Sequence, residues 1–167
     1  MTTYADIKDF TKKIGAEWEN VVWEKVASDN CNAILDKPGI YRLIVIVNRA
    51  IRIPNEYKVC GIADAEISGE LSAGTVLSVG KTKKLRTRIK QHFGNNKNNN
   101  RLKKRLLNIG IKIDLESPLQ VEALVKILND NQLELQYSEI DEWWKRDLLE
   151  AYGRAISAAF FDLEIEH

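Results

Sequence analysis

Apolar side chains near the N-terminus recur at the spacing of a helix. Five of them are separated by three or four residues, so they fall on one side of an α-helix. They are Ile7, Phe10, Ile14, Trp18 and Val21. The pattern predicts an amphipathic helix over residues 6–27, which ends before the turn-forming run Ser28-Asp29-Asn30.

Three other segments have the composition of strands. Residues 40–47 follow Pro38-Gly39 and are rich in β-branched side chains, which predicts a largely buried strand. A second strand is predicted over residues 75–79. A third is predicted over residues 133–138, where apolar and polar side chains alternate.

The rest of the chain is predicted to form loops and helices. Residues 48–74 are irregular and read as an elaborated loop with a short strand at 57–60. Residues 94–100 are rich in asparagine and predict an exposed, mobile loop. Ser117-Pro118 is a favourable helix start, because serine caps a helix and proline suits its first position. The further helices are expected over residues 85–93, 101–109, 118–128 and 141–160.

The order of these elements is helix, two strands, three helices, strand and helix. Both faces of such a sheet need helices to cover them. We therefore expect an α/β (α+β) fold with a small three-stranded, mostly antiparallel sheet flanked by helices. The length of 167 residues suits one domain, so residues 1–167 are interpreted as a single domain with residues 1–30 as a helical extension.

Composition argues against several classes of protein. Hydrophobic residues make up 44% and charged residues 29% of the chain, as in soluble globular proteins. No apolar run is long enough to span a membrane, and the polar N-terminus does not resemble a signal peptide. Cys31 and Cys60 are therefore expected to be reduced thiols in a cytoplasmic protein. A zinc site is not expected, because the chain lacks a CxxC motif and has only two histidines.

Charge is distributed unevenly along the chain. The net charge is +1, yet residues 81–105 hold 11 Lys and Arg and no Asp or Glu. A solvated helix face normally mixes both signs, so this basic segment favours contact with a polyanion such as nucleic acid. The alternative is a solvated helix face followed by a loop. The residues expected to contact nucleic acid are Lys83, Lys84, Arg86, Lys90, Lys97, Arg101 and Lys104.

The last predicted helix carries an apolar stripe formed by Trp144, Leu148, Ala151, Ala155 and Ala159. This stripe predicts the buried face of the helix, with Trp144 in the core. Glu150 lies off the stripe, where it faces solvent or a cleft. The pair Trp143-Trp144 could instead form a platform on which bases stack.

Several short motifs occur in a defined order. Gly39-Ile40-Tyr41 opens the first predicted strand, and Leu77-Ser78-Val79-Gly80 ends the second. The next helix carries Leu85, Arg88 and His92, and the last helix carries Glu150, followed 12 residues later by Asp162. Together these motifs resemble the GIY-YIG nuclease superfamily. The resemblance covers about residues 37–165, nearly the whole chain apart from the N-terminal helix.

The resemblance implies a metal-dependent endonuclease that hydrolyses DNA phosphodiester bonds. Glu150 would hold one divalent cation, Mg²⁺ or Mn²⁺. Arg88 would donate to the scissile phosphate. Tyr41 would position or deprotonate the attacking water, and His92 would assist proton transfer. Lys81 would contact phosphate or lower the pKa of a neighbouring group.

The helix pattern agrees with these roles, because Arg88 and His92 are four residues apart and share one helix face. Two positions depart from the family. Ser78 stands where the family has its second tyrosine, and Asp162 stands where it has an asparagine. Two alternatives therefore remain: a catalytically inactive nucleic-acid-binding module, or a protein-interaction domain that uses the basic segment 81–105.

Overall fold

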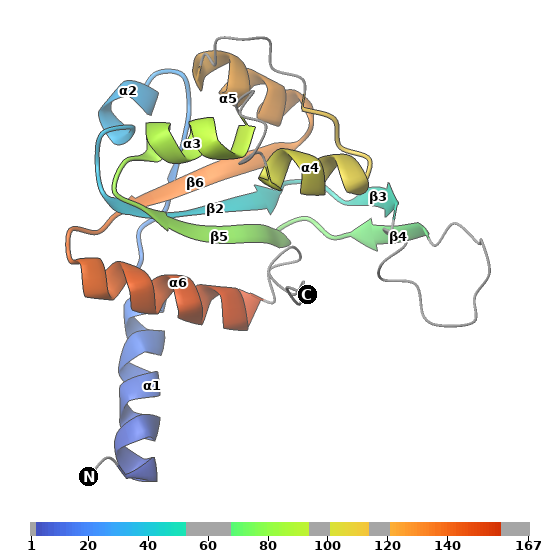
Figure 1. Ribbon diagram of the computed structural model, residues 1–167. Helices are drawn as coiled ribbons and strands as arrows, with labels where there is room; N and C mark the ends of the chain where they lie inside the picture. Colours follow the sequence, from blue (N-terminus) through green and yellow to red (C-terminus); the bar gives the residue numbers. More distant parts are fainter. Residues whose placement is uncertain (1–2, 53–67, 94–100, 114–120, 158–167) are drawn as a thin grey trace.

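The computed structural model describes residues 3–52, 68–93, 101–113 and 121–157 (Figure 1). The predicted strand at 57–60, the loop at 94–100, the helix start at Ser117-Pro118 and the end of the last helix lie outside these ranges. The elements are α1 (Tyr4–Glu19), β1 (Glu24–Lys25), α2 (Cys31–Ile34), β2 (Gly39–Val45), β3 (Arg49–Arg52), β4 (Ser68–Leu71), β5 (Val76–Thr82), α3 (Leu85–Phe93), α4 (Arg101–Asn108), α5 (Val121–Asp130), β6 (Leu133–Glu139) and α6 (Trp143–Ser157).

The fold is mixed α/β, as expected, but its main sheet is larger than the sequence predicted. Within the described ranges, the sheet has four antiparallel strands in the order β1-β6-β2-β5. The short strand β1 adds the fourth strand by pairing Glu24 with Tyr137 and Lys25 with Gln136. A separate two-stranded sheet, β3-β4, lies in the segment expected to be an irregular loop.

The predicted helix over residues 6–27 was wrong for residues 20–27. Helix α1 ends at Glu19, and the backbone N–H of the cap residue Asn20 donates to Ala16. The β-branched pair Val21-Val22 follows, and such side chains favour extended backbone over helix. The chain therefore leaves the helix here and reaches the sheet edge as β1.

Helix α1 packs through only part of its apolar side. Ile14 and Trp18 are buried, whereas Tyr4, Ile7 and Phe10 are exposed. Figure 1 shows why: the N-terminal part of α1 projects past α6. The N-terminal part of the apolar side, with Ile7 and Phe10, therefore does not reach the core.

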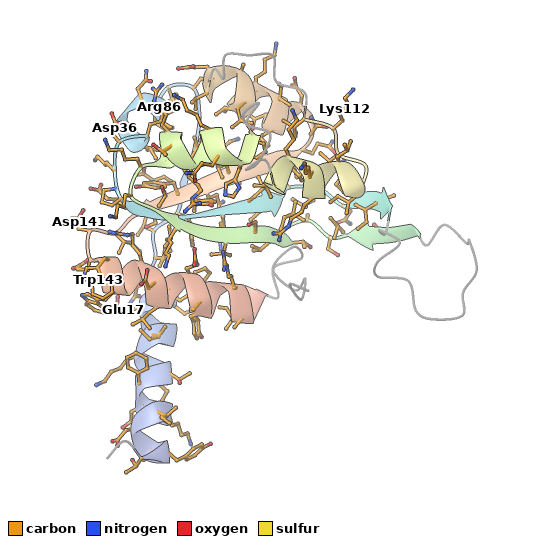
Figure 2. All side chains as sticks on the ribbon, in the orientation of Figure 1. Glu17, Asp36, Arg86, Lys112, Asp141 and Trp143 are labelled. Carbon is orange, nitrogen blue, oxygen red and sulfur yellow. The ribbon has the colours of Figure 1, made fainter. Side chains whose placement is uncertain are left out.

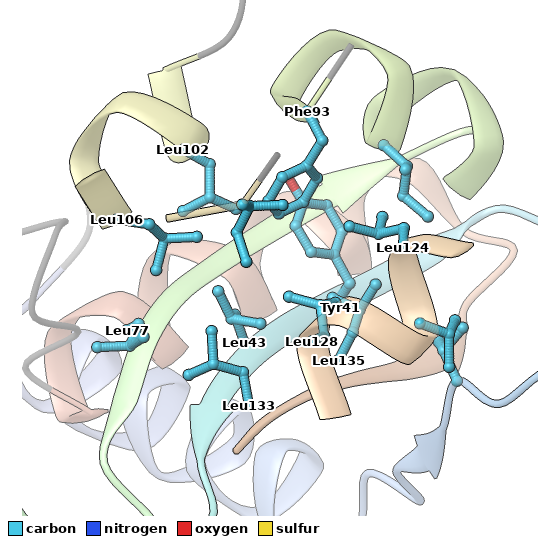
Figure 3. Packing of buried hydrophobic residues seen from close by; sticks show 14 of the residues in the cluster. Tyr41, Leu43, Leu77, Phe93, Leu102, Leu106, Leu124, Leu128, Leu133 and Leu135 are labelled. Carbon is cyan, nitrogen blue, oxygen red and sulfur yellow. The ribbon is translucent and has the colours of Figure 1, made fainter. Parts of the chain in front are cut away.

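The main sheet separates two apolar clusters. Tyr41, Leu43 and Val45 of β2 belong to the larger one, which lies under α3, α4 and α5. Figure 3 shows Tyr41 and Leu43 in this cluster, together with Phe93 of α3. Ile40 of β2 belongs to the smaller one, on the side of α1 and α6. Alternate residues of one strand thus point to opposite faces of the sheet.

Helix α6 buries a different face from the one that its apolar stripe predicted. Its buried residues are Arg146, Leu149 and Gly153, whereas Trp144 is 49% exposed and Ala151 is exposed. Arg146 tolerates burial because its Nη1 donates to the carbonyl oxygens of Ile140 and Asp141, at 2.9 and 2.7 Å. Hydrophobicity alone could not locate a buried face on which Leu149 lies between an arginine and a glycine.

Two further expectations concern the cellular setting. Cys31 is a buried free thiol, and burial, followed by the charge of Glu122, raises its pKa. Cys60 lies outside the described residues. Among the helices that the structure describes, none combines the length and the apolar composition that crossing a bilayer demands.

Candidate functional site

The motif residues gather around β5, which is the outer strand at one end of the main sheet. Helix α3 covers one face of the sheet beside this strand, and α6 covers the other (Figure 1). Leu85, Ile89 and Phe93 anchor α3, while Leu149 anchors α6 against Val79. Side chains from both helices can therefore reach this same outer strand.

Tyr41 and His92 are in direct contact, although 51 positions separate them in the chain. Tyr41 Oη and His92 Nε2 share a hydrogen bond of 2.8 Å, in which the histidine tautomer decides the donor. The two rings meet edge to face, with their centroids 6.1 Å apart. The Tyr41 side chain is only 5% exposed, so surrounding atoms hold the phenol in one orientation. The structure thus brings together two of the residues predicted to be catalytic.

Gly80 makes room for this phenol. It pairs directly with Tyr41 across β2 and β5, and directly opposed residues share one face of the sheet. A Cβ atom at Gly80 would overlap Cζ and Oη of Tyr41. Gly39 lies opposite Glu139 on β6, and a Cβ there would overlap the carbonyl oxygen of Ser138 and would also lie 2.8 Å from Cζ and Oη of Tyr137. The glycines of both motifs therefore leave space that tyrosine rings occupy.

We expect Gly80→Ala to destabilise the fold by about 1–3 kcal/mol, the usual effect of overpacking a filled core. Urea unfolding would measure the difference in the free energy of unfolding. Its control is the same change in a Tyr41→Ala background, where the phenol that the new methyl meets is gone. The cost of Gly80→Ala should then fall sharply. An equal cost in both backgrounds would show that the Tyr41 ring is not the obstacle.

A cleft of about 720 Å³ lies along the end of β5, between α3 and the first turns of α6. Its lining carries five basic side chains, one carboxylate, one indole and three uncharged polar residues. They are Lys81, Thr82, Lys83, Lys84, Thr87, Arg88, Gln91, Trp143, Arg146 and Asp147. This balance favours an anionic ligand.

Three of the basic groups in the cleft have defined partners. Lys81 Nζ donates to Asp147 Oδ1 at 2.6 Å. Arg146 is held on backbone carbonyls, as described above. Arg88 Nη2 lies 3.5 Å from the carbonyl oxygen of Lys81, a long contact at the limit of a hydrogen bond. Lys83 and Lys84 are exposed. The charges of Lys83 and Lys84, and that of the loosely held Arg88, are thus available to a bound anion.

Glu150 lies next to this cleft, but it is not among the residues that line it. Its side chain is 14% exposed, and its carboxylate is 3.7 Å from the Arg154 guanidinium. Arg154 Nε in turn donates to the carbonyl oxygen of Val79 on β5 at 3.0 Å. Glu150 therefore belongs to a network of side chains that joins α6 to β5. It does not simply face solvent.

Carboxylates are the side chains that could hold a divalent cation beside the cleft. Among the described residues, no group of three or more His, Cys, Asp or Glu side chains gathers closely enough to enclose a metal. Magnesium does not need such a group, since one or two carboxylates suffice when water and substrate phosphate supply the other ligands. Asp147 and Glu150 are three residues apart on α6 and so are neighbours on one helix side. This pair fits that mode.

The remaining predicted residues lie in different places. Ser78 is half-buried and pairs with Leu43 across the strands. Arg86 and Lys90 are exposed on α3, and Lys104 is exposed on α4, outside the cleft lining. Figure 2 shows Arg86 on the outer side of α3. Lys97, Asp162 and the side chain of Arg101 lie outside the described residues.

The structure adds residues that the sequence did not single out for the site. Asp147 and Arg146 line the cleft from α6, and Arg154 pairs with Glu150. Trp143, which the sequence offered as part of a stacking platform, lines the cleft beside them. Positions 143, 146 and 147 have the i, i+3, i+4 spacing of one helix side. This spacing was the feature of the sequence that could have placed the three residues together. The apolar stripe of α6 instead predicted that another side of the helix packs against the sheet.

Comparisons of this chain with protein-family models, with curated proteins and with solved structures find no match. The resemblance to the GIY-YIG nucleases therefore stays a prediction that rests on the ordered motifs.

Proposed function

We propose that this chain binds the phosphate backbone of nucleic acid, DNA foremost, beside β5 and hydrolyses its phosphodiester bonds in a metal-dependent reaction. The observation that carries the proposal is the Tyr41–His92 hydrogen bond. Neither residue lines the basic cleft, but His92 directly follows Gln91 on α3, and Gln91 does line it. A buried phenol held on an imidazole is an arrangement suited to proton transfer. Adjacent cations are what a phosphodiester substrate requires.

Each residue has a role that follows from its position. Arg88 lies one helical turn before His92 and would hold the scissile phosphate, because a guanidinium donates to two phosphate oxygens at once. Lys83 and Lys84 would hold neighbouring phosphates. Tyr41 would orient the attacking water, and His92 would take up the proton that the phenol relays.

Glu150, with Asp147 one turn before it, would hold the Mg²⁺ or Mn²⁺ ion. When bound, the ion neutralises a phosphate oxygen and stabilises the leaving oxygen. The carboxylates themselves have a second role, since each neutralises a cation: Asp147 pairs with Lys81, and Glu150 pairs with Arg154.

A second candidate is a binding module that does not cleave. Ser78 favours it, because a serine hydroxyl is shorter than a tyrosine and does not act as a phenol. The same cleft would then bind phosphates without hydrolysing them. A third candidate is a protein-interaction domain whose basic surface meets an acidic partner.

Cleavage and binding by the wild-type chain separate these candidates. We expect nicking of supercoiled plasmid with Mg²⁺ or Mn²⁺ and none with EDTA. In EDTA, the logarithm of the DNA binding constant should fall with the logarithm of salt concentration, with a slope of roughly −3 if three to four phosphates are neutralised. Binding without cleavage would favour the module, and absence of binding at low salt would remove both nucleic-acid candidates.

A matched pair of double variants locates the binding surface. Lys83→Ala with Lys84→Ala should make the salt slope shallower by about 2 units, near one unit for each lost phosphate contact. Lys12→Ala with Lys13→Ala removes two exposed lysines from α1, which do not line the cleft, and should leave the slope unchanged.

A further inference from the structure

Trp143 occupies an unusual position for a large apolar side chain. It is the first residue of α6, and its side chain is 67% exposed while lining the basic cleft. Figure 2 shows it at the same end of α6 as Asp141. Its neighbour Trp144 is also exposed but is not part of the cleft. The cleft thus combines an open indole with Lys81, Lys84 and Arg88.

This combination is suited to one class of ligand. An inorganic anion or a phosphorylated side chain would bind the lysine and arginine side chains but would make no contact with the indole ring. A nucleotide uses both, because its phosphate binds the cations and its base stacks on the aromatic ring. The volume of about 720 Å³ also lies within the range of sites for drug-sized ligands, a size class that includes a nucleotide.

Stacking on Trp143 requires a base that is free to leave its own stack. In duplex DNA the π-faces of the bases are covered by neighbouring bases, and a groove contact meets only base edges and phosphates. Single strands, loops, bulges and ends present open base faces. The aromatic wall of the cleft therefore discriminates between duplex and unpaired nucleic acid.

We infer that the cleft takes an unpaired nucleotide, with its phosphate on Lys83, Lys84 and Arg88 and its base stacked on Trp143. This inference rests on the proposed function and narrows its substrate class to single-stranded or locally unpaired nucleic acid. The stack supplies affinity without base sequence preference, because every base has a π-face.

The test compares Trp143→Ala with Trp144→Ala, two exposed tryptophans in adjacent positions. Binding is measured by fluorescence anisotropy in EDTA with a labelled oligothymidylate, a duplex of equal length, and an abasic oligomer of the same backbone. Trp143→Ala should weaken oligothymidylate binding about 5- to 150-fold, the range for losing one base stack. Trp143→Phe should restore part of it. Trp144→Ala should change it less than twofold.

The abasic oligomer separates stacking from charge. Trp143→Ala should not change its binding, because its phosphates remain and its bases are absent. Thermal unfolding of each variant shows whether the fold is retained, and Trp143→Phe keeps the test valid if the alanine variant fails to fold.

Two failures are distinguishable. If wild type binds none of the three nucleic acids at low salt, the proposed function fails, and this inference fails with it. If wild type binds them with salt sensitivity but Trp143→Ala behaves as Trp144→Ala does, the inference is overturned and the proposed function stands. Equal wild-type affinity for oligothymidylate and the abasic oligomer would overturn it in the same way.

Discussion

Tyr41→Phe should lower the rate of phosphodiester cleavage by about 10²–10⁴-fold, the usual contribution of one proton-transfer group. The change removes only the hydroxyl that forms the 2.8 Å hydrogen bond with His92. The ring itself stays packed against Gly80. Losing one hydrogen bond should cost about 1 kcal/mol of stability, so the protein stays folded. Single-turnover cleavage of a labelled strand at saturating protein would measure the rate.

Tyr137→Phe is the matched control for this variant. Tyr137 lies opposite Tyr41 on β6, and its hydroxyl also makes one short bond, a donation to the carbonyl oxygen of Lys37 at 2.6 Å. Burial, reinforced by the charge of Glu139, raises the pKa of Tyr137, so this phenol stays protonated and serves as a donor. Tyr137→Phe should lose similar stability and keep its cleavage rate.

His92→Ala extends the test to the partner of the phenol. If Tyr41 and His92 act as one unit, the double variant should cleave about as slowly as the slower single variant. If the fold-loss of the double variant equals the product of the two single fold-losses, Tyr41 and His92 have independent roles. Wild-type rates in Tyr41→Phe, beside an intact Tyr137→Phe control, would remove the pair from the mechanism.

Local pattern predicted the middle of this fold well. Strands β2 and β6, together with helices α3 and α4, lie within two residues of the expected ranges, because their side chains keep a clear period and turn residues bound them. The pattern failed where tertiary pairing decides. Glu24-Lys25 is extended because β6 offers it backbone partners, and nothing in its own sequence favours a strand.

The site shows the same division. The sequence placed Arg88 and His92 on one helix side and Tyr41 at the start of a strand, and the structure joins Tyr41 to His92. The sequence did not identify the carboxylate that lines the cleft. That depends on the rotation of α6 about its axis, which Arg146 and Gly153 set through carbonyl contacts and the close approach of Trp18. Neither residue carries a hydrophobic signal.

Glu150→Gln should reduce metal-dependent cleavage by roughly 100-fold or more, since stabilising the charge that develops at a phosphate is worth several kcal/mol. The variant keeps the shape of the side chain and removes its charge. Because Arg154 is about half exposed, losing its ion pair should change the free energy of unfolding by less than about 1 kcal/mol. Cleavage across a Mn²⁺ titration, with Mn²⁺ binding measured by calorimetry without substrate, would separate metal binding from later steps.

Asp147→Asn is the control, because Asp147 is the neighbouring carboxylate and also pairs with a cation, Lys81. If Glu150 holds the metal, Glu150→Gln should weaken Mn²⁺ binding more than Asp147→Asn does. Asp147→Asn should also release Lys81 to the substrate and strengthen DNA binding in EDTA. The reverse order of Mn²⁺ affinities would contradict the assignment to Glu150. The metal would then lie in the cleft itself, on Asp147. In that case the metal ligand would be one helical turn before Glu150, the position to which the family resemblance assigns it.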